Sequence, residues 1–244
     1  MIDSGVYRMN FRGLSFGEAL RLGGKAGFLP AMVLKLLGKK GSYLWLPPRD
    51  TERVCAREEL SADAQSRLMP AVAELEGLGY RSGLFSRLAI SLDPTYKDGA
   101  SYRALHEDGR RLFYLAYLRR ETCGPRGMAR QDVVNPIGMF ITEGGIGTVV
   151  LTNSQYLDGD GTSDVIQIDG AGPAAVAQRL AQELEKARWP VRRFASIEEA
   201  AAATTERDER AWAARIRRGL VARVPPEEES RVVVEARARL AAQK

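Results

Sequence analysis

Apolar and polar side chains alternate along much of the middle of the chain, between residues 85 and 169. A period of two is typical of β-strands that bury one face. Two connections in this region, Glu107–Arg110 and the glycine-rich Glu143–Gly147, are short and therefore require antiparallel neighbours. The pattern predicts a six-stranded antiparallel meander. Its strand candidates are FSRLAISL, ASYRALH, RRLFYLAYL, PIGMFIT, GTVVLTN and DVIQID.

The hairpin at residues 99–120 is the clearest part of this pattern. Asp108-Gly109 lies between its two strand candidates, and a tight type I′ turn favours this pair because both central residues need a positive φ. The second strand, Leu112–Leu118, is apolar at successive positions and therefore on both faces. We expect it to be a central strand that is covered on both sides.

Helical periodicity flanks the predicted sheet. Apolar residues recur at helical spacing over 62–78, where Pro70 predicts a kink or a later start. A covering helix is expected over about 173–187, directly after the last strand candidate. Two further helices are expected over 196–222 and 227–243, because both stretches carry favourable residues in their first turn.

The order of these elements predicts an α+β fold in two parts. Residues 1–190 form an α+β domain, with helical pieces in 1–40, a strand at 42–46 and the sheet over about 85–169. Residues 191–244 form a basic helical extension. A meander packed by flanking helices is typical of a helix-grip-like fold, which can enclose a small apolar ligand in a cavity under the sheet.

Composition narrows the class of protein. Hydrophobic residues make up 45% and charged residues 27% of the 244, as in ordinary globular chains. No run reaches the roughly 18–20 apolar residues of a membrane-spanning helix. The N-terminus lacks a signal-peptide pattern, so we expect a cytoplasmic protein with free thiols at Cys55 and Cys123.

A single histidine limits the chemistry that the chain can perform. His106 is the only one, which excludes catalytic sites that need two histidines and most zinc sites. It lies between acidic residues, where a histidine can act as a general base, but at the edge of a turn we expect an exposed polar side chain. The sequence therefore favours a non-enzymatic protein, and we assign no catalytic residue.

A glycine-rich turn after the last strand candidate resembles a nucleotide-binding motif. Gly170, Gly172 and Ala175 match the G-x-G-x-x-G/A turn of dinucleotide-binding proteins, and the letters GAGPA resemble the flavoprotein version. Gln167 and Asp169 are unusual in the buried parallel strand that precedes such a turn, and the neighbouring strands form hairpins. An ordinary strand-to-helix turn with Pro173 at the first helical position is the alternative.

The loop LDGDGTSD is the candidate metal site. Asp158, Asp160 and Asp164 could offer oxygen ligands to Ca²⁺, in a spacing that partly resembles the loops of calcium-binding repeats. No repeat and no bidentate glutamate accompany them. Asp and Gly are also favoured in any turn, so a solvated loop is the alternative.

The basic excess of the chain lies in its C-terminal quarter. Residues 186–244 hold 14 Lys and Arg against 9 Asp and Glu, whereas the residues before them hold 22 of each. Arginines around a tryptophan can bind nucleic acid. The apolar stripe Trp212, Ile216, Leu220 and Val224 needs a cover from this domain, a second copy or another protein. We assign partner binding to Arg207, Arg210, Trp212, Arg215, Ile216, Arg217, Arg218 and Leu220.

The N-terminal run over residues 21–46 also carries a candidate surface. It mixes Leu, Phe and Trp with five cations, and basic amphipathic helices can lie on anionic membranes. The helical pieces are short and interrupted by Gly and Pro, so we expect them to pack against the sheet.

These observations lead to three hypotheses. The first is a non-enzymatic protein-binding or assembly module without a cofactor, which contacts another protein or a second copy through its C-terminal helices. The second is a nucleotide- or flavin-binding protein that uses the turn at Gly170–Ala175. The third is a protein that binds nucleic acid or a membrane surface through basic helices.

Overall fold

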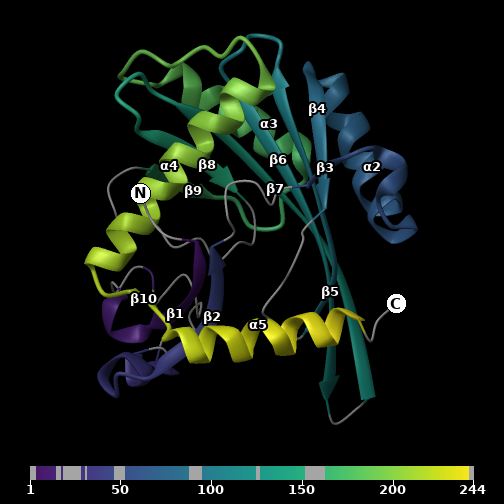
Figure 1. The fold of residues 1–244 in the computed structure, drawn as a ribbon. Helices are drawn as coiled ribbons and strands as arrows, with labels where there is room; N and C mark the ends of the chain where they lie inside the picture. The colour runs from purple at the N-terminus through teal and green to yellow at the C-terminus, as the bar shows by residue number, and fades with distance from the viewer. Residues whose placement is uncertain are drawn as a thin grey trace.

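The computed structural model describes residues 4–14, 18, 29–30, 32–46, 53–87, 95–124, 127–151 and 163–241. Within them the chain is an α+β protein with two sheets (Figure 1). The larger sheet contains β3 (Arg53–Cys55), β4 (Tyr80–Arg87), β5 (Tyr96–His106), β6 (Leu112–Gly124), β7 (Gly127–Ile141), β8 (Gly147–Leu151) and β9 (Ser163–Gln167), in that order.

The smaller sheet joins the two ends of the described chain. Its strands are β1 (Gly5–Asn10), β2 (Lys40–Leu46) and β10 (Val221–Arg223), in the order β10-β1-β2. The helices longer than one turn in residues 53–87 and 163–241 are α2 (Ala62–Gly77), α3 (Pro173–Glu185), α4 (Ile197–Arg217) and α5 (Pro226–Ala241). Single 3-10 turns, η1 (Phe11–Gly13) and η2 (Arg57–Glu59), follow β1 and β3.

The large sheet follows the predicted meander over most of its width. Neighbouring strands from β3 to β8 pair antiparallel. It differs from the prediction in two respects, because β3 adds a seventh strand at one edge and β9 pairs parallel to β8. A parallel neighbour requires the chain to return to the end of the sheet where β8 begins, and the connection from Leu151 to Ser163 is long enough for this.

The hairpin between β5 and β6 is present, but its turn is wider than expected. The N–H of Gly109 donates to the carbonyl of His106 at 2.8 Å, so the central residues are Glu107 and Asp108 rather than Asp108 and Gly109. The N–H of His106 donates to the carbonyl of Arg111 at 2.9 Å and closes a four-residue loop, which is another common hairpin connection. Gly109 has a φ of +70°, a conformation that favours glycine.

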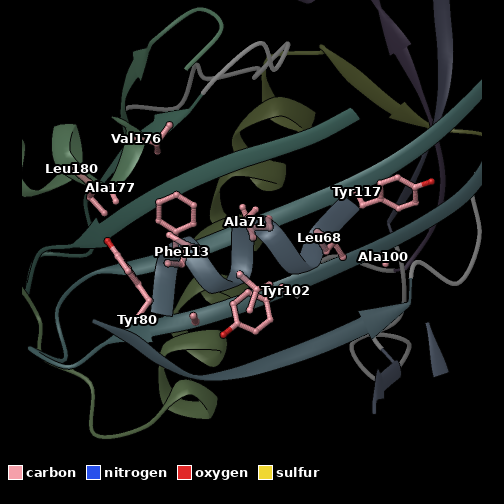
Figure 2. Close-up of a cluster of buried hydrophobic side chains, with 14 of the residues drawn as sticks. Leu68, Ala71, Tyr80, Ala100, Tyr102, Phe113, Tyr117, Val176, Ala177 and Leu180 are labelled. Atoms are coloured by element: carbon pink, nitrogen blue, oxygen red, sulfur yellow. The ribbon is translucent and has the colours of Figure 1, made fainter. Parts of the chain in front are cut away.

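The central strand β6 is covered on both faces, as its pattern predicts. Phe113 packs on one face in a cluster that includes Leu68 of α2 and Leu180 of α3 (Figure 2). Its neighbour Leu112 packs on the opposite face in a cluster that includes Ile197 of α4. Figure 1 shows α4 crossing the near side of the sheet and α3 lying behind it. The sheet is therefore the middle layer of three.

The predicted helices form close to their expected bounds. Ser61 caps α2 by accepting a hydrogen bond from the N–H of Ala64, and Pro70 lies inside this helix without ending it. Ser196 caps α4 in the same way through the N–H of Glu199. The expected helix over 196–222 ends at Arg217, because the chain turns there to form β10.

The C-terminal quarter contacts both sheets. α4 packs on the large sheet, while β10 pairs with β1, and α5 lies along the small sheet (Figure 1). Val6 of β1 is buried in a cluster with Val224, Val232 and Ala236, so α5 supplies part of a second core. The domain boundary at residue 190 stays a prediction.

The N-terminal region is only partly helical. Residues 29–30 and 32–36 are helical, and so is Glu18, but residues 5–10 form a strand where helical pieces are expected. The other positions of the helix expected after Ser15 lie outside the described residues.

The packing of Tyr102 on β4 gives a test of the core. A Cβ at Gly83 would lie 2.1–2.2 Å from atoms of the Tyr102 ring, so this strand position has no room for a side chain. We expect Gly83→Ala to lower the free energy of unfolding by about 1–3 kcal/mol, the usual cost of overpacking. Urea denaturation followed by circular dichroism measures the change.

Gly77→Ala is the matched control. A Cβ at this last residue of α2 meets no atom within 4 Å, so the substitution should be neutral or should stabilise by up to about 1 kcal/mol. Equal stabilities for the two variants would show that Tyr102 does not pack on Gly83.

Candidate functional site

The arginines of α4 that were assigned to partner binding are partly used inside the fold. The side chain of Arg207 is 3% exposed, forms an ion pair with Asp208 at 2.7 Å and lies 3.7 Å from the sulfur of Met139. Arg218 donates to the fully buried carboxylate of Glu18 at 2.6 Å, which neutralises that charge. Among the cations of the set, Arg210 and Arg217 are exposed, and Arg215 and Arg218 are half-buried.

The apolar stripe of the C-terminal region is covered by the chain itself. Trp212 packs on Tyr7 of β1, with ring centroids 5.2 Å apart. Leu220 and Val224 are buried in the clusters that β1 shares with the C-terminal elements, and only Ile216 is exposed. The cover that the stripe requires is therefore the N-terminal strand. Partner binding by the exposed members of the set stays a prediction.

The turn at Gly170–Ala175 connects β9 to α3 as an ordinary strand-to-helix turn. The N–H of Ala174 donates to the carboxylate of Glu74 at 3.2 Å, so an acidic side chain of α2 occupies the helix end where a phosphate would bind. β9 is an edge strand with β8 as its neighbour, whereas the nucleotide-binding strand of a dinucleotide fold is a central one. These contacts disfavour a nucleotide or flavin at Gly170, Gly172 and Ala175.

The candidate calcium ligands are only partly described. Asp158 and Asp160 lie outside the described residues, and Asp164 is an exposed residue of β9. Within the described part of the chain, no group of three or more His, Cys, Asp or Glu is placed to hold a metal ion. Calcium binding by the three aspartates stays a prediction.

His106 is buried rather than exposed, which differs from the expectation for a residue beside a turn. Its Nδ1 accepts the N–H of Asp108 at 3.1 Å, and its Nε2 lies 2.7 Å from the guanidinium of Arg111. The ring also packs edge-on against Tyr80. These contacts hold the hairpin loop on the core.

The most exposed apolar surface of the described chain lies on the helix at residues 29–36. Its four side chains are Leu29, Val33, Leu36 and Leu37, which are 72%, 53%, 76% and 62% exposed. They recur at i, i+4, i+7 and i+8, so they share one face of the helix. Soluble proteins rarely leave such a face open unless it contacts a partner or a membrane. We call these four residues the Leu29–Leu37 face.

Two polar contacts anchor this helix beside the small sheet. On the side away from the Leu29–Leu37 face, the ammonium of Lys35 donates to the carbonyls of Arg12 and Leu14 at 2.8 and 2.5 Å. The helix ends at Gly38, which has a φ of +62°, and the N–H of Lys39 closes the end by donating to the carbonyl of Leu34. The sequence places this helix correctly. The Leu29–Leu37 face is exposed, while Met32 and Leu34 of the same helix are half-buried.

The segment around the helix is basic. Between Glu18 and Asp50 the sequence contains no acidic residue, while it contains Arg21, Lys25, Lys35, Lys39, Lys40 and Arg49. Lys39 and Lys40 are exposed directly after the helix, where cations also complement its dipole. The apolar face therefore has a positive border.

A cationic pocket opens beside the end of this helix. It has a volume of about 170 Å³ and lies between the small sheet and the start of α5. Gly38 and Lys40 line it from the helix end and β2, and Arg8 and Arg12 line it from β1 and η1. Sequence reasoning missed this pocket because its residues come from both ends of the chain.

Comparison with protein-family models, curated proteins and solved structures finds no match to this chain. Its function must therefore be argued from the surface described above. No helix within the described residues has the length and apolar character needed to cross a membrane.

A separate cluster of charges joins α2 to the β6–β7 hairpin. Asp63 accepts hydrogen bonds from Arg119 at 2.7 Å and from Arg130 at 3.0 Å. Asp132 accepts from Arg130 at 2.8 Å and from the hydroxyl of Tyr117 at 2.9 Å. The guanidinium of Arg130 is the main cause that holds the pKa of both carboxyls below its usual value. Both carboxylates are thus neutralised inside the cluster.

This cluster should make stability depend on pH. A carboxyl whose folded pKa is lowered stabilises the fold above its unfolded pKa of about 3.9, and this contribution is lost as the pH falls through the folded pKa. We expect Asp132→Asn to be less stable than the parent at about pH 7 and to lose less on acidification to about pH 3. Urea denaturation at both pH values measures this, with Asp164→Asn as the exposed control. An identical acid loss in the parent and Asp132→Asn would contradict the lowered pKa.

Proposed function

We propose that this protein binds anionic membrane surfaces through the Leu29–Leu37 face and the cations beside it. The observation that carries the proposal is an apolar helix face that is open to solvent inside a segment without acidic residues. Helices of this kind lie in the plane of the interface, with the apolar side chains below the headgroups and the cations at headgroup level.

The magnitudes favour reversible attachment. A Leu or Val side chain contributes about 1.5–3 kcal/mol when it is fully buried, and a four-residue face enters the interface only partly. Each Lys or Arg close to an anionic surface adds about 1 kcal/mol. Lys39, Lys40 and Arg12 are the exposed cations next to the helix end. Binding should therefore need both contributions and should weaken as salt screens the charges.

The membrane explains this surface better than the other candidates. Nucleic acid would use the cations but would leave the Leu29–Leu37 face open, because phosphates and sugars offer no apolar partner. An apolar ligand under the large sheet is less favoured, because fully buried side chains such as Leu68, Phe113 and Leu180 occupy the space between the sheet and its helices. A protein partner for the same face is a different outcome of the test below.

Vesicle co-sedimentation tests the proposal with purified protein alone. We expect the parent to bind vesicles of phosphatidylcholine mixed with phosphatidylglycerol, to bind pure phosphatidylcholine weakly, and to be released by salt. Leu36→Glu/Leu37→Glu places two charges on the apolar face and should weaken binding at least about tenfold, which corresponds to about 1.4 kcal/mol.

Val234→Glu serves as the matched control, because Val234 is an equally exposed apolar residue on α5. It should bind vesicles like the parent. The proposal is wrong if the parent does not bind anionic vesicles, and the face then serves a protein partner. It is also wrong if Leu36→Glu/Leu37→Glu binds the vesicles as well as Val234→Glu does.

A further inference from the structure

We propose that the cationic pocket beside β1 binds the phosphate group of a phosphomonoester. This proposal goes beyond the membrane surface proposed above. Arg12 and Lys40 belong to both surfaces, but the Leu29–Leu37 face is not part of the pocket. The pocket is named the Arg8 pocket here, and its charged residues are Arg8, Arg12, Lys40, Arg223 and Glu228.

The register of the small sheet builds the floor of this pocket. The pairing of β1 with β2 shifts register between Arg8 and Asn10, and Arg8, Met9 and Asn10 all line the pocket. Asn10 pairs with Lys40 of β2, which places a second cation at the same level. On the other side Arg8 pairs with Ala222 of β10, whose small side chain leaves space in front of the guanidinium.

Arg8 is held in a fixed orientation. Its guanidinium lies over the ring of Tyr43, 5.0 Å from the centroid, and donates to Glu228 at 3.1 Å. Its Nε is buried and has no hydrogen-bond partner among the described residues. The side chain as a whole is half-buried and lines the pocket. A guanidinium has five N–H donors, so those that Glu228 does not use can contact phosphate oxygens.

Arg12 completes the cationic wall next to the helix end. Its guanidinium lies directly against Gly38, where an added Cβ would be 2.4 Å from the Nε of Arg12. Arg8 forms an ion pair with Glu228 at 3.1 Å and Arg223 forms one with Glu229 at 3.6 Å. Arg12 and Lys40 add two further cations to the lining of the pocket. These cations around a volume of about 170 Å³, several times the roughly 30 Å³ of a water molecule, suit a compact polyvalent anion.

Glu228 occupies part of the position that the anion would take. Its carboxylate accepts from the hydroxyl of Tyr43 at 2.5 Å and from Arg8, and the bond from Tyr43 holds the pKa of Glu228 below its usual value. A phosphate in the pocket would therefore compete with an internal carboxylate. Removing cations from the pocket should therefore lower the affinity for phosphate, and removing the charge of Glu228 should raise it.

The experiment measures binding of inorganic phosphate and glycerol 3-phosphate by calorimetry. Arg12→Gln/Lys40→Gln should weaken binding at least about fivefold, while Glu228→Gln should tighten it about threefold or more, because it removes the competing charge and keeps a hydrogen-bond acceptor. Arg87→Gln/Arg188→Gln removes two exposed cations elsewhere and should leave binding unchanged. Circular dichroism checks that each variant is folded.

A second arm separates a lipid headgroup from a free phosphate compound. Vesicles that contain phosphatidic acid carry a phosphomonoester, whereas phosphatidylglycerol vesicles adjusted to equal charge do not. If the parent prefers phosphatidic acid and Arg12→Gln/Lys40→Gln loses this preference, the pocket binds the lipid headgroup. If the parent binds soluble phosphate without preferring phosphatidic acid, the pocket binds a free phosphate compound. The inference is overturned if neither is seen, or if the control double variant loses as much as the pocket variant. Leu36→Glu/Leu37→Glu should keep soluble phosphate binding, so failure of the membrane proposal is distinguishable.

Discussion

The insertion of β1 between β2 and β10 is the interaction on which the surface features depend. Tyr7 of β1 pairs with Leu44 on one side and with Arg223 on the other. This pairing joins the two ends of the described chain, buries Leu220 and Val224, and gives Trp212 an aromatic partner. It also places Arg8 beside the start of α5. Without it, the Arg8 pocket would have no second wall.

The large sheet was predictable because its signals are local. Alternation specifies the strands, and short loops such as Glu107–Arg110 specify antiparallel neighbours. The strand β3 has only three residues and no detectable alternation, so the sequence pattern does not predict it. The parallel pairing of β9 with β8 was also not predicted. The connection after Leu151 is long enough for a parallel or an antiparallel strand, and no local sequence signal distinguishes the two.

The site was less predictable, because its residues meet only through long-range pairing. Leu220 and Val224 of the apolar stripe are buried, as its spacing indicates. A periodic pattern does not say whether the cover is internal or a second molecule. Arg207 illustrates the same problem for charge. It reads as a surface cation in a basic helix, yet it lies buried against Met139 with Asp208 as its partner. Glu74 likewise reaches Ala174 across the tertiary structure, which the motif letters of the glycine turn cannot show.

The exposed helix shows why spacing alone is not enough to locate a buried face. Leu29, Val33, Leu36 and Leu37 have the spacing of a helix that packs on a core, yet all four are exposed. On the opposite side of that helix, two carbonyls anchor the ammonium of Lys35, so this side faces the protein. Turning the apolar side inward would break these bonds and would bury the ammonium of Lys35 without them. The apolar face is thus kept outward by a polar anchor, beside cations that no acidic residue of the segment neutralises.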